Sequence, residues 1–320
     1  IDSIYLTYVT PPFVDNESVA KEIVEVSRMK KKPVICNYMT DKTQFIEPTR
    51  ILNDGGVPCY TFPEMAAKAL AALTRYNDIR IRKTGEVLKF NDVNKTVAES
   101  VLKKAKDAKR EILSAAEVYE ILAAYKIPVA GWKVVMDAES AVKAAELMGY
   151  PVVVKADSAA IIHKSDVGGV AVNLKDGNAV KSVIEKMQQK FKAEDLKFFI
   201  QKYMHGGTEL IIGANADTSV GHLIMFGLGG IFVEIFKDVI FNIVPVTDVE
   251  AREMLTSIKG APLIRGTRGK DGVDEKGVVE ILQRVSQMVI DLPSIQEMDL
   301  NPVIAYKDKV YVVDARIKSN

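Results

Sequence analysis

The segment PVVVKADSAAIIHKSDVGGVAVNL, residues 151–174, places a lysine, a histidine and two adjacent glycines between two β-branched runs. The runs PVVVK and GGVAVNL are typical of strands. Glycine amides approach an anion closely because no Cβ atom interferes, and Lys155 supplies a positive charge at the end of the first strand. The segment therefore predicts a phosphate-binding loop that includes Gly168 and Gly169. A two-glycine hairpin beside a surface lysine explains these residues equally well.

The sequence on either side of this loop predicts two lobes of an α/β unit. In the smaller lobe, residues 111–204, Ser114 and Asp137 are candidate N-caps of two helices, and WKVVM and LKFFIQKYM predict further strands. In the larger lobe, residues 205–320, three apolar runs predict adjacent antiparallel strands: TELIIGANAD (208–217), GHLIMFGLGGIFVEIF (221–236) and DVIFNIVPV (238–246). A long helix over 278–289 and a last strand pair, NPVIAY and KVYVVDA, complete this lobe.

Residues 1–76 predict a parallel sheet. Short β-branched runs alternate there with helical patterns, in the order SIYLTYV (3–9), KPVICNYM (32–39) and GGVPCY (55–60), as is typical of parallel α/β structure. Parallel strands need cover on both faces, so we expect a preceding segment to complete this domain. Residues 77–110 are rich in Lys, Asp and Asn, which predicts a linker or a solvated helix.

The composition excludes several classes of protein. The 320 residues include 43 Lys and Arg against 42 Asp and Glu, so the net charge of +1 gives no general attraction to nucleic acid or to an anionic membrane. The longest apolar run, residues 223–236, has 14 residues, whereas a membrane helix needs about 20. Two cysteines, Cys36 and Cys59, are too few for a disulfide framework. We therefore expect a cytoplasmic protein with reduced thiols and with neither nucleic acid nor membrane as a partner.

A cluster of oxygen-bearing residues lies near the C-terminus. Alternate residues of an extended strand share a face, so Glu297, Asp299 and Asn301 of EMDLNP point the same way. A turn at 307–309 would bring Asp314 opposite that face. Carboxylate and amide oxygens without histidine or cysteine suit Mg²⁺. A solvated strand face is the alternative, but the apolar residues before Asp314 favour a partly buried carboxylate that needs a partner.

Three features have a chemical interpretation beside a structural one. Glu209 could accept hydrogen bonds from a ribose or face solvent, and the glycines of FGLGGIF (226–232) could close over a phosphate or form a tight turn. His163 lies in the predicted phosphate loop, eight residues after Lys155. A neutral imidazole there could attack the terminal phosphoryl group of a nucleotide, although a lone histidine is more often structural. Together these residues predict a nucleotide site between two lobes.

Several segments together resemble the ATP-grasp module of the NDP-forming acyl-CoA synthetases, which are ADP-forming acetate–CoA ligases of the succinyl-CoA synthetase superfamily. They are residues 151–174, 207–217, 224–239, 250–255, 267–269 and 297–317. The resemblance runs from about Ser114 to the C-terminus. Residues 1–76 resemble the end of the parallel-sheet, flavodoxin-like ligase domain that precedes the module in single-chain members. The implied fold is α/β, with a two-lobed ATP-grasp module after that domain.

The resemblance implies a reversible reaction in which acyl-CoA, phosphate and ADP give acid, CoA and ATP through a phosphohistidine. The residues that match the family's site are His163, Asp299 and Glu297 for catalysis, Lys155, Gly168, Gly169, Gln201, Tyr203, Met204 and Glu209 for the nucleotide, and Asn301 and Asp314 for Mg²⁺. The implied substrates are ATP or ADP, CoA, phosphate and a carboxylic acid. The implied partners are the N-terminal CoA-binding and ligase segments of the same protein and a second copy in a homo-oligomer.

Two other functions are compatible with the same residues. An ordinary ATP-grasp ligase forms an acyl phosphate directly on a carboxylate and needs no histidine in the loop. A nucleotide-sensing module binds nucleotide without turnover, but the presence of Lys155, His163, Asn301 and Asp314 argues against such a degenerate site.

Overall fold

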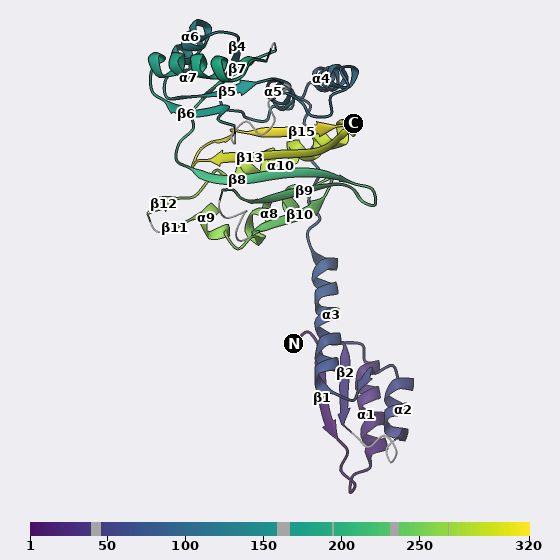
Figure 1. Ribbon diagram of the computed structural model, residues 1–320. Helices are drawn as coiled ribbons and strands as arrows, with labels where there is room; N and C mark the ends of the chain where they lie inside the picture. Colours follow the sequence, from purple (N-terminus) through teal and green to yellow (C-terminus); the bar gives the residue numbers. More distant parts are fainter. Residues whose placement is uncertain (40–45, 159–166, 194, 231–236, 268) are drawn as a thin grey trace. The chain divides into compact units, whose positions relative to one another are not determined.

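The structure, a computed structural model, describes residues 1–39, 46–158, 167–193, 195–230, 237–267 and 269–320 (Figure 1). The chain divides into two compact units, Ile1–Lys83 and Thr84–Asn320. No helix within the described ranges combines the length and the apolar character that a membrane crossing requires.

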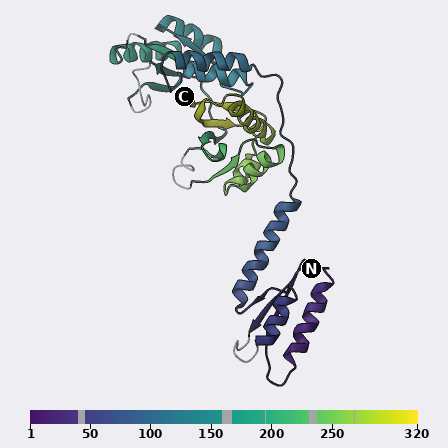
Figure 2. The ribbon, with the colours of Figure 1, turned by 90° about the vertical axis from the view of Figure 1, so that its right-hand side faces the viewer.

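The first unit contains a three-stranded parallel sheet in the order β1-β2-β3. Its elements are β1 (Ile4–Val9), α1 (Asn16–Arg28), β2 (Val34–Met39), α2 (Ile46–Asp54), β3 (Cys59–Tyr60) and α3 (Pro63–Ile81). Helices α1 and α2 lie side by side (Figures 1 and 2), and Ala20, Val24 and Leu52 share one apolar core with Val34 and Cys36. The parallel sheet expected in residues 1–76 is therefore confirmed.

A four-stranded antiparallel sheet forms the smaller lobe of the second unit, in the order β4-β7-β5-β6. Its elements are β4 (Trp132–Val135), α6 (Ala138–Met148), β5 (Val152–Asp157), β6 (Val170–Leu174), α7 (Gly177–Lys190) and β7 (Lys197–Lys202). Both helices cover the side of this sheet that faces away from the larger sheet (Figure 1). Ala145 and Ile184 pack there with Val154. As expected, α6 begins after Asp137, whose carboxylate accepts the Ser140 N–H.

The larger lobe is built on a six-stranded antiparallel sheet in the order β10-β9-β8-β13-β14, with β15 also paired to β13. Its elements are β8 (Thr208–Asp217), β9 (Gly221–Leu228), β10 (Val239–Ile243), α8 (Asp248–Ser257), α9 (Ala261–Arg265), β11 (Gly266–Thr267), β12 (Lys270–Asp271), α10 (Glu275–Asp291), β13 (Ile295–Ala305), β14 (Val310–Val312) and β15 (Ala315–Ser319). Helix α10 buries Val278, Leu282 and Val285 in the core of this lobe. The expected adjacent antiparallel strands and the long helix are present.

The segment expected as a linker or a solvated helix, residues 77–110, contains structured parts of both units. Helix α3 continues to Ile81, and α4 (Lys95–Asp107) packs beside α5 (Ala115–Ala124). Four small or aliphatic residues of α4 are buried in the core of the larger lobe: Ala98, Val101, Leu102 and Ala105. Helix α5 also joins that core through Val118 and Ile121, although the sequence placed it in the smaller lobe. The lysines of α4 face solvent, and their number obscured the apolar stripe between them.

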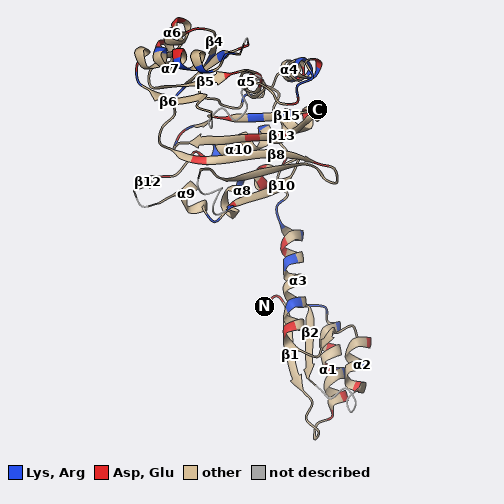
Figure 3. Cartoon of the chain, in the orientation of Figure 1, with Lys and Arg blue, Asp and Glu red and all other residues tan. Residues whose placement is uncertain are grey.

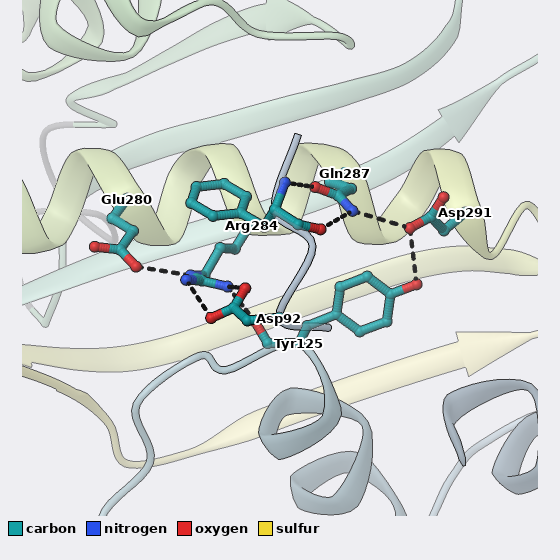
Figure 4. A network of polar contacts seen from close by, with 7 residues as sticks. Asp92, Tyr125, Glu280, Arg284, Gln287 and Asp291 are labelled. Atoms are coloured by element: carbon teal, nitrogen blue, oxygen red, sulfur yellow. Dashed lines mark hydrogen bonds and ion pairs between the residues drawn. The ribbon is translucent and has the colours of Figure 1, made fainter. Parts of the chain in front are cut away.

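Residues 84–94 are attached to α10 by side chains rather than by strand pairing (Figure 4). The amide of Gln287 accepts the Phe90 N–H at 2.7 Å and donates to the Phe90 carbonyl at 3.1 Å, as a neighbouring strand would. The Arg284 guanidinium, whose side chain is 7% exposed, donates to both carboxylate oxygens of Asp92 at 3.0 and 3.1 Å. The same guanidinium donates to the Tyr125 carbonyl. These contacts fix the start of the second unit onto its largest helix.

Candidate functional site

Lys155 lies where the two lobes meet. It sits within β5, paired with Val170 of β6 and Phe199 of β7. Its ammonium Nζ is 2.8 Å from Asp314 Oδ1 and 3.3 Å from the Val313 carbonyl, both at the end of β14 in the larger lobe. The Lys155 side chain is only 12% exposed, whereas that of Asp314 is 55% exposed. The pair therefore joins the two lobes and presents its carboxylate to solvent.

The Val313 carbonyl is the centre of a polar cluster that the sequence did not predict. It accepts hydrogen bonds from Tyr119 Oη at 2.7 Å, from Gln201 Nε2 at 2.9 Å and from Lys155 Nζ. Gln201 Nε2 also donates to Tyr119 Oη, so α5, β7 and β14 are connected through one backbone oxygen. Burial raises the pKa of Tyr119, which keeps its hydroxyl protonated as a donor. The cluster therefore holds β5 and β7 of the smaller lobe against the larger lobe.

Gln201, proposed from the sequence as a nucleotide contact, is fully buried in β7. Its amide nitrogen is used by Tyr119 and Val313, and its Oε1 has no hydrogen-bond partner among the described residues. Tyr203 and Met204, which follow β7, are both half-buried. The Tyr203 N–H donates to the Pro151 carbonyl, so this hinge segment is held against the smaller lobe.

The acidic residues of β13 share one face, as the alternation predicted. Met298 and Leu300 are buried in the core, whereas Glu297 is exposed and Asp299 is half-buried on the opposite face. Burial raises the pKa of Asp299; Arg316 on the next strand acts to lower this pKa, and the charges of Asp314 and Glu297 raise it further. Asp299 Oδ1 is buried and has no hydrogen-bond partner among the described residues. A buried carboxylate oxygen in this state is a ready acceptor for a cation or an N–H donor.

A β-bulge brings Asn301 and Asp314 together. The register of β13 against β8 shifts between Leu300 and Val303, which takes Asn301 out of the regular ladder. The Asn301 N–H then donates to the Asp314 carbonyl at 3.0 Å, and the Val313 N–H donates to the Pro302 carbonyl. Both Asn301 and Asp314 have exposed side chains. The bulge therefore presents two hard oxygen ligands at the same edge of the sheet.

The oxygen-bearing residues of this edge could supply only some of the ligands of a Mg²⁺ ion. Within the described ranges no three His, Cys, Asp or Glu side chains come close enough to hold a metal ion by themselves. Asn301 and Asp314 supply an amide and a carboxylate, and Asp299 adds an unpartnered oxygen in the same neighbourhood. Mg²⁺ is typically bound by one or two carboxylates together with water and substrate phosphates. These residues fit such a shared site and do not form a cage made of protein ligands alone.

The glycines of the predicted phosphate loop lie where β6 begins. Gly168 has φ +66°, a left-handed conformation that disfavours other residues. The Gly169 carbonyl accepts the Ala156 N–H at 2.7 Å and so continues the antiparallel β5–β6 pairing. Gly168 and Gly169 thus lead into β6, the strand that pairs with β5. His163 lies outside the described residues.

Glu209 lines a separate groove of about 940 Å³ in the larger lobe. Its carbonyl accepts the Gly229 N–H at 2.7 Å, and a Cβ atom on Gly230 would lie 2.8 Å from Glu209 Oε2. The glycines of FGLGGIF therefore allow β9 to end directly against Glu209. Neither Lys155 nor Asp314 lines this groove. The residues proposed for the nucleotide thus occupy two places, the lobe junction and this groove.

Comparison with known proteins shows to which protein family the chain is related. A model of the ATP-grasp domain family matches residues 104–318. The beta subunit of acetate–CoA ligase [ADP-forming] II from Pyrococcus furiosus is 41% identical over 241 residues, which cover 73% of this chain and 98% of that subunit. This chain belongs to the ADP-forming acyl-CoA ligase family.

Longer members of the ADP-forming acyl-CoA ligase family extend the match into the first unit. The 4-hydroxybutyrate–CoA ligase [ADP-forming] of Nitrosopumilus maritimus is 41% identical over 293 residues, which are 90% of this chain and 42% of that protein. Acetate–CoA ligase [ADP-forming] I of Archaeoglobus fulgidus is 35% identical over 98% of this chain and 45% of its own length. The chain therefore spans less than half of each of these relatives.

A solved structure of similar sequence shares the fold of most of this chain. Acetyl-coenzyme A synthetase 1 of Ca. Korarchaeum cryptofilum, in complex with coenzyme A and Mg-AMPPCP, has a chain that is 37% identical, with a TM-score of 0.64. The match covers 70% of this chain and 100% of that chain. In that structure a phosphohistidine segment points towards the nucleotide binding site.

Proposed function

We propose that this chain is the nucleotide-binding part of an ADP-forming acyl-CoA synthetase and that His163 carries a phosphoryl group between the nucleotide and an acyl phosphate. The observation that carries the proposal is the meeting of Lys155 and Asp314 at the lobe junction, beside the unpartnered buried oxygen of Asp299. One cation, two exposed oxygen ligands and a carboxylate that lacks a donor form a set suited to phosphoryl transfer. The phosphohistidine segment of the Korarchaeum relative supports the same assignment.

Each residue has a role that its position allows. Lys155, now neutralised by Asp314, would contact the nucleotide phosphates. Asn301 and Asp314 would hold Mg²⁺, which, when bound, neutralises charge on the phosphate oxygens. Asp299, with Glu297 beside it, would accept an N–H of the His163 ring and so orient the opposite nitrogen. The backbone of Gln201, Tyr203 and Met204 would contact the base, Glu209 the ribose, and the amides of Gly168 and Gly169 the phosphates.

The complete reaction would couple acid, CoA and ATP to acyl-CoA, ADP and phosphate, reversibly. CoA and the acid would bind outside this chain, in segments corresponding to the parts of the longer relatives that it does not match. The Pyrococcus furiosus relative is a separate beta subunit, which supports a nucleotide-binding part that works with a CoA-binding partner and assembles as an oligomer.

The proposal is tested by phosphorylation of the chain itself. With Mg²⁺ and [γ-³²P]ATP, the chain is expected to acquire a label that is stable in base and labile in acid, as a phosphohistidine is. His163→Asn should abolish the label, whereas His205→Asn, at an exposed position after β7, should retain it. Label that survives in His163→Asn would contradict the proposal. Hydroxamate formed from an added carboxylate by His163→Asn would instead support a ligase that forms an acyl phosphate directly.

A further inference from the structure

Arg316 lies directly across from Asp299. The two residues are paired in the antiparallel register of β15 and β13, with Leu300 opposite Ala315 beside them. Ala315 and Ile317 are buried, whereas Arg316 is exposed. Paired residues of neighbouring strands extend their side chains on the same face, so Arg316 shares the face of Asp299. Figure 3 shows a basic position on β15 beside acidic positions on β13.

Arg316 differs from the other cations around this face in having no fixed partner. Lys155 is paired with Asp314 at 2.8 Å, and Lys318, two residues further along β15, is paired with Glu111 at 3.3 Å. No hydrogen bond or ion pair fixes the Arg316 side chain among the described residues, although its charge acts to lower the pKa of Asp299. A guanidinium offers five N–H donors in a planar fork that matches the oxygens of a phosphate group. This cation is therefore free to bind an anion on the acidic face.

The carboxylates of this face would repel a phosphoryl group, and a nearby cation would offset that repulsion. The charges of Glu297 and Asp314 act on Asp299, the residue proposed to orient the His163 ring. A phosphoryl group brought there meets three carboxylates, and during transfer its negative charge is spread over three equatorial oxygens. Asn301 and Asp314 would hold Mg²⁺, which would neutralise charge on the nucleotide phosphates. A second positive group near Asp299 would offset this charge, and Arg316 is the residue of β15 in register with Asp299.

We infer that Arg316 is a catalytic residue that binds the oxygens of the transferred phosphoryl group while it passes between the nucleotide and His163. The inference rests on the proposed function. In the step, the bond from the γ-phosphorus to the β–γ bridging oxygen breaks, a bond forms from a His163 ring nitrogen to phosphorus, ADP leaves with the bridging oxygen, and the ring proton passes to solvent. The Arg316 guanidinium keeps its charge and its protons throughout. It binds the three oxygens that move with the phosphorus.

A purely structural role predicts a different outcome from this catalytic role. If Arg316 only neutralised Asp299, its loss would disturb ADP and ATP binding alike. If Arg316 binds the transferred phosphoryl group, its loss should slow phosphoryl transfer and weaken the binding of ATP. The binding of ADP, which lacks that group, should be unchanged.

The test compares Arg316→Gln and Arg316→Lys with Lys318→Gln, a matched control on the same face of β15, in the full chain. Rapid-quench labelling with Mg-[γ-³²P]ATP should be slower by about 1,000-fold or more in Arg316→Gln, in the range known for arginines that stabilise phosphoryl transfer. Arg316→Lys should recover part of the rate because it keeps the charge and loses the fork. Lys318→Gln should label at the parent rate. Calorimetric titration should show ADP affinity unchanged within about twofold in Arg316→Gln and ATP affinity reduced about tenfold, as expected for a charge-assisted hydrogen bond.

Two results would overturn the inference. One is labelling of Arg316→Gln within threefold of the parent, and the other is a loss of ADP affinity equal to the loss of ATP affinity. If the parent chain itself fails to label, the proposed function fails separately, and the ATP-to-ADP affinity ratio of Arg316→Gln still decides whether Arg316 binds the terminal phosphate.

Discussion

Replacing Arg284 with methionine should destabilise the second unit because it removes the cation that holds residues 84–94 on α10. The guanidinium donates to Asp92, Glu280 and the Tyr125 carbonyl, and it stacks 4.0 Å from the centroid of the Phe90 ring. Methionine keeps the packing of the aliphatic stem while removing every polar contact. The substitution therefore isolates the contribution of the charge and its hydrogen bonds.

The size of the Arg284 effect follows from the exposure of its partners. Asp92 and Glu280 are 54% and 53% exposed, so water replaces the guanidinium at both carboxylates and their loss adds little. The Tyr125 carbonyl is buried and would lose its Arg284 donor, which costs about 1–3 kcal/mol. Loss of the cation–π contact adds about 0.5–1 kcal/mol. Because the desolvation cost of the buried cation is also removed, we expect a net loss of about 2–3 kcal/mol in the free energy of unfolding.

Trp132 provides the assay for this change. It is the single tryptophan of the chain and stacks on Phe199, with ring centroids 5.2 Å apart, so its fluorescence reports unfolding of the second unit alone. Arg252→Met is the matched control because Arg252 makes an exposed i,i+4 pair with Asp248; this variant should change the urea-unfolding free energy by less than about 0.5–1 kcal/mol. If Arg284→Met costs no more than Arg252→Met, the reasoning from burial is refuted.

Two further predictions concern the lobe junction and the start of α5. Lys155→Gln should weaken binding of a fluorescent Mg-ADP analogue by about 10- to 100-fold, since it would remove the proposed charge-assisted contact to phosphate; a change below threefold would remove Lys155 from the nucleotide site. The pKa of Glu117 is raised by burial but held below its ordinary value of 4.5 by hydrogen bonds from Arg110 and Ser114. This carboxylate should therefore stabilise the fold above about pH 4.5 and lose that contribution as the pH falls further. Urea unfolding of the parent and of Glu117→Gln should differ at pH 7 and converge as the pH falls below the lowered pKa of Glu117, and a difference independent of pH would contradict this sign.

Elements with a strong residue pattern could be predicted from the sequence. Met298 and Leu300 alternate with Glu297 and Asp299, and burial of the apolar pair alone determines which face carries the carboxylates. The parallel sheet of the first unit follows from the alternation of its strands and helices in the same way. Residues 77–110 were predicted as a linker or a solvated helix, and the buried face of α4 was missed because its lysines dominate the composition of the segment. Its buried residues, at positions 98, 101, 102 and 105, have the i, i+3, i+4, i+7 spacing that would have revealed it.

The polar cluster at the lobe junction could not be predicted, for a different reason. Its acceptor is the Val313 carbonyl, and every residue has a carbonyl, so no residue type marks the position. Its donors, Tyr119 and Gln201, are 194 and 112 residues away from Val313 in the chain. The bulge that displaces Asn301 likewise depends on how β13 pairs with β8, which a single strand does not encode. Contacts of this kind exist only once the two sheets are assembled.

The Lys155–Asp314 pair suggests how the proposed site would bind its metal and its nucleotide. In the proposed complex Lys155 would bind phosphate and Asp314 would bind Mg²⁺, and in this structure each neutralises the other. A charge that is 12% exposed would be costly to leave unpaired. Binding of Mg²⁺ and nucleotide together exchanges one ionic partner for another on both residues, so neither charge is left alone. Binding of either one without the other would leave Lys155 or Asp314 without its counter-charge, which favours entry of the metal and the nucleotide as a complex.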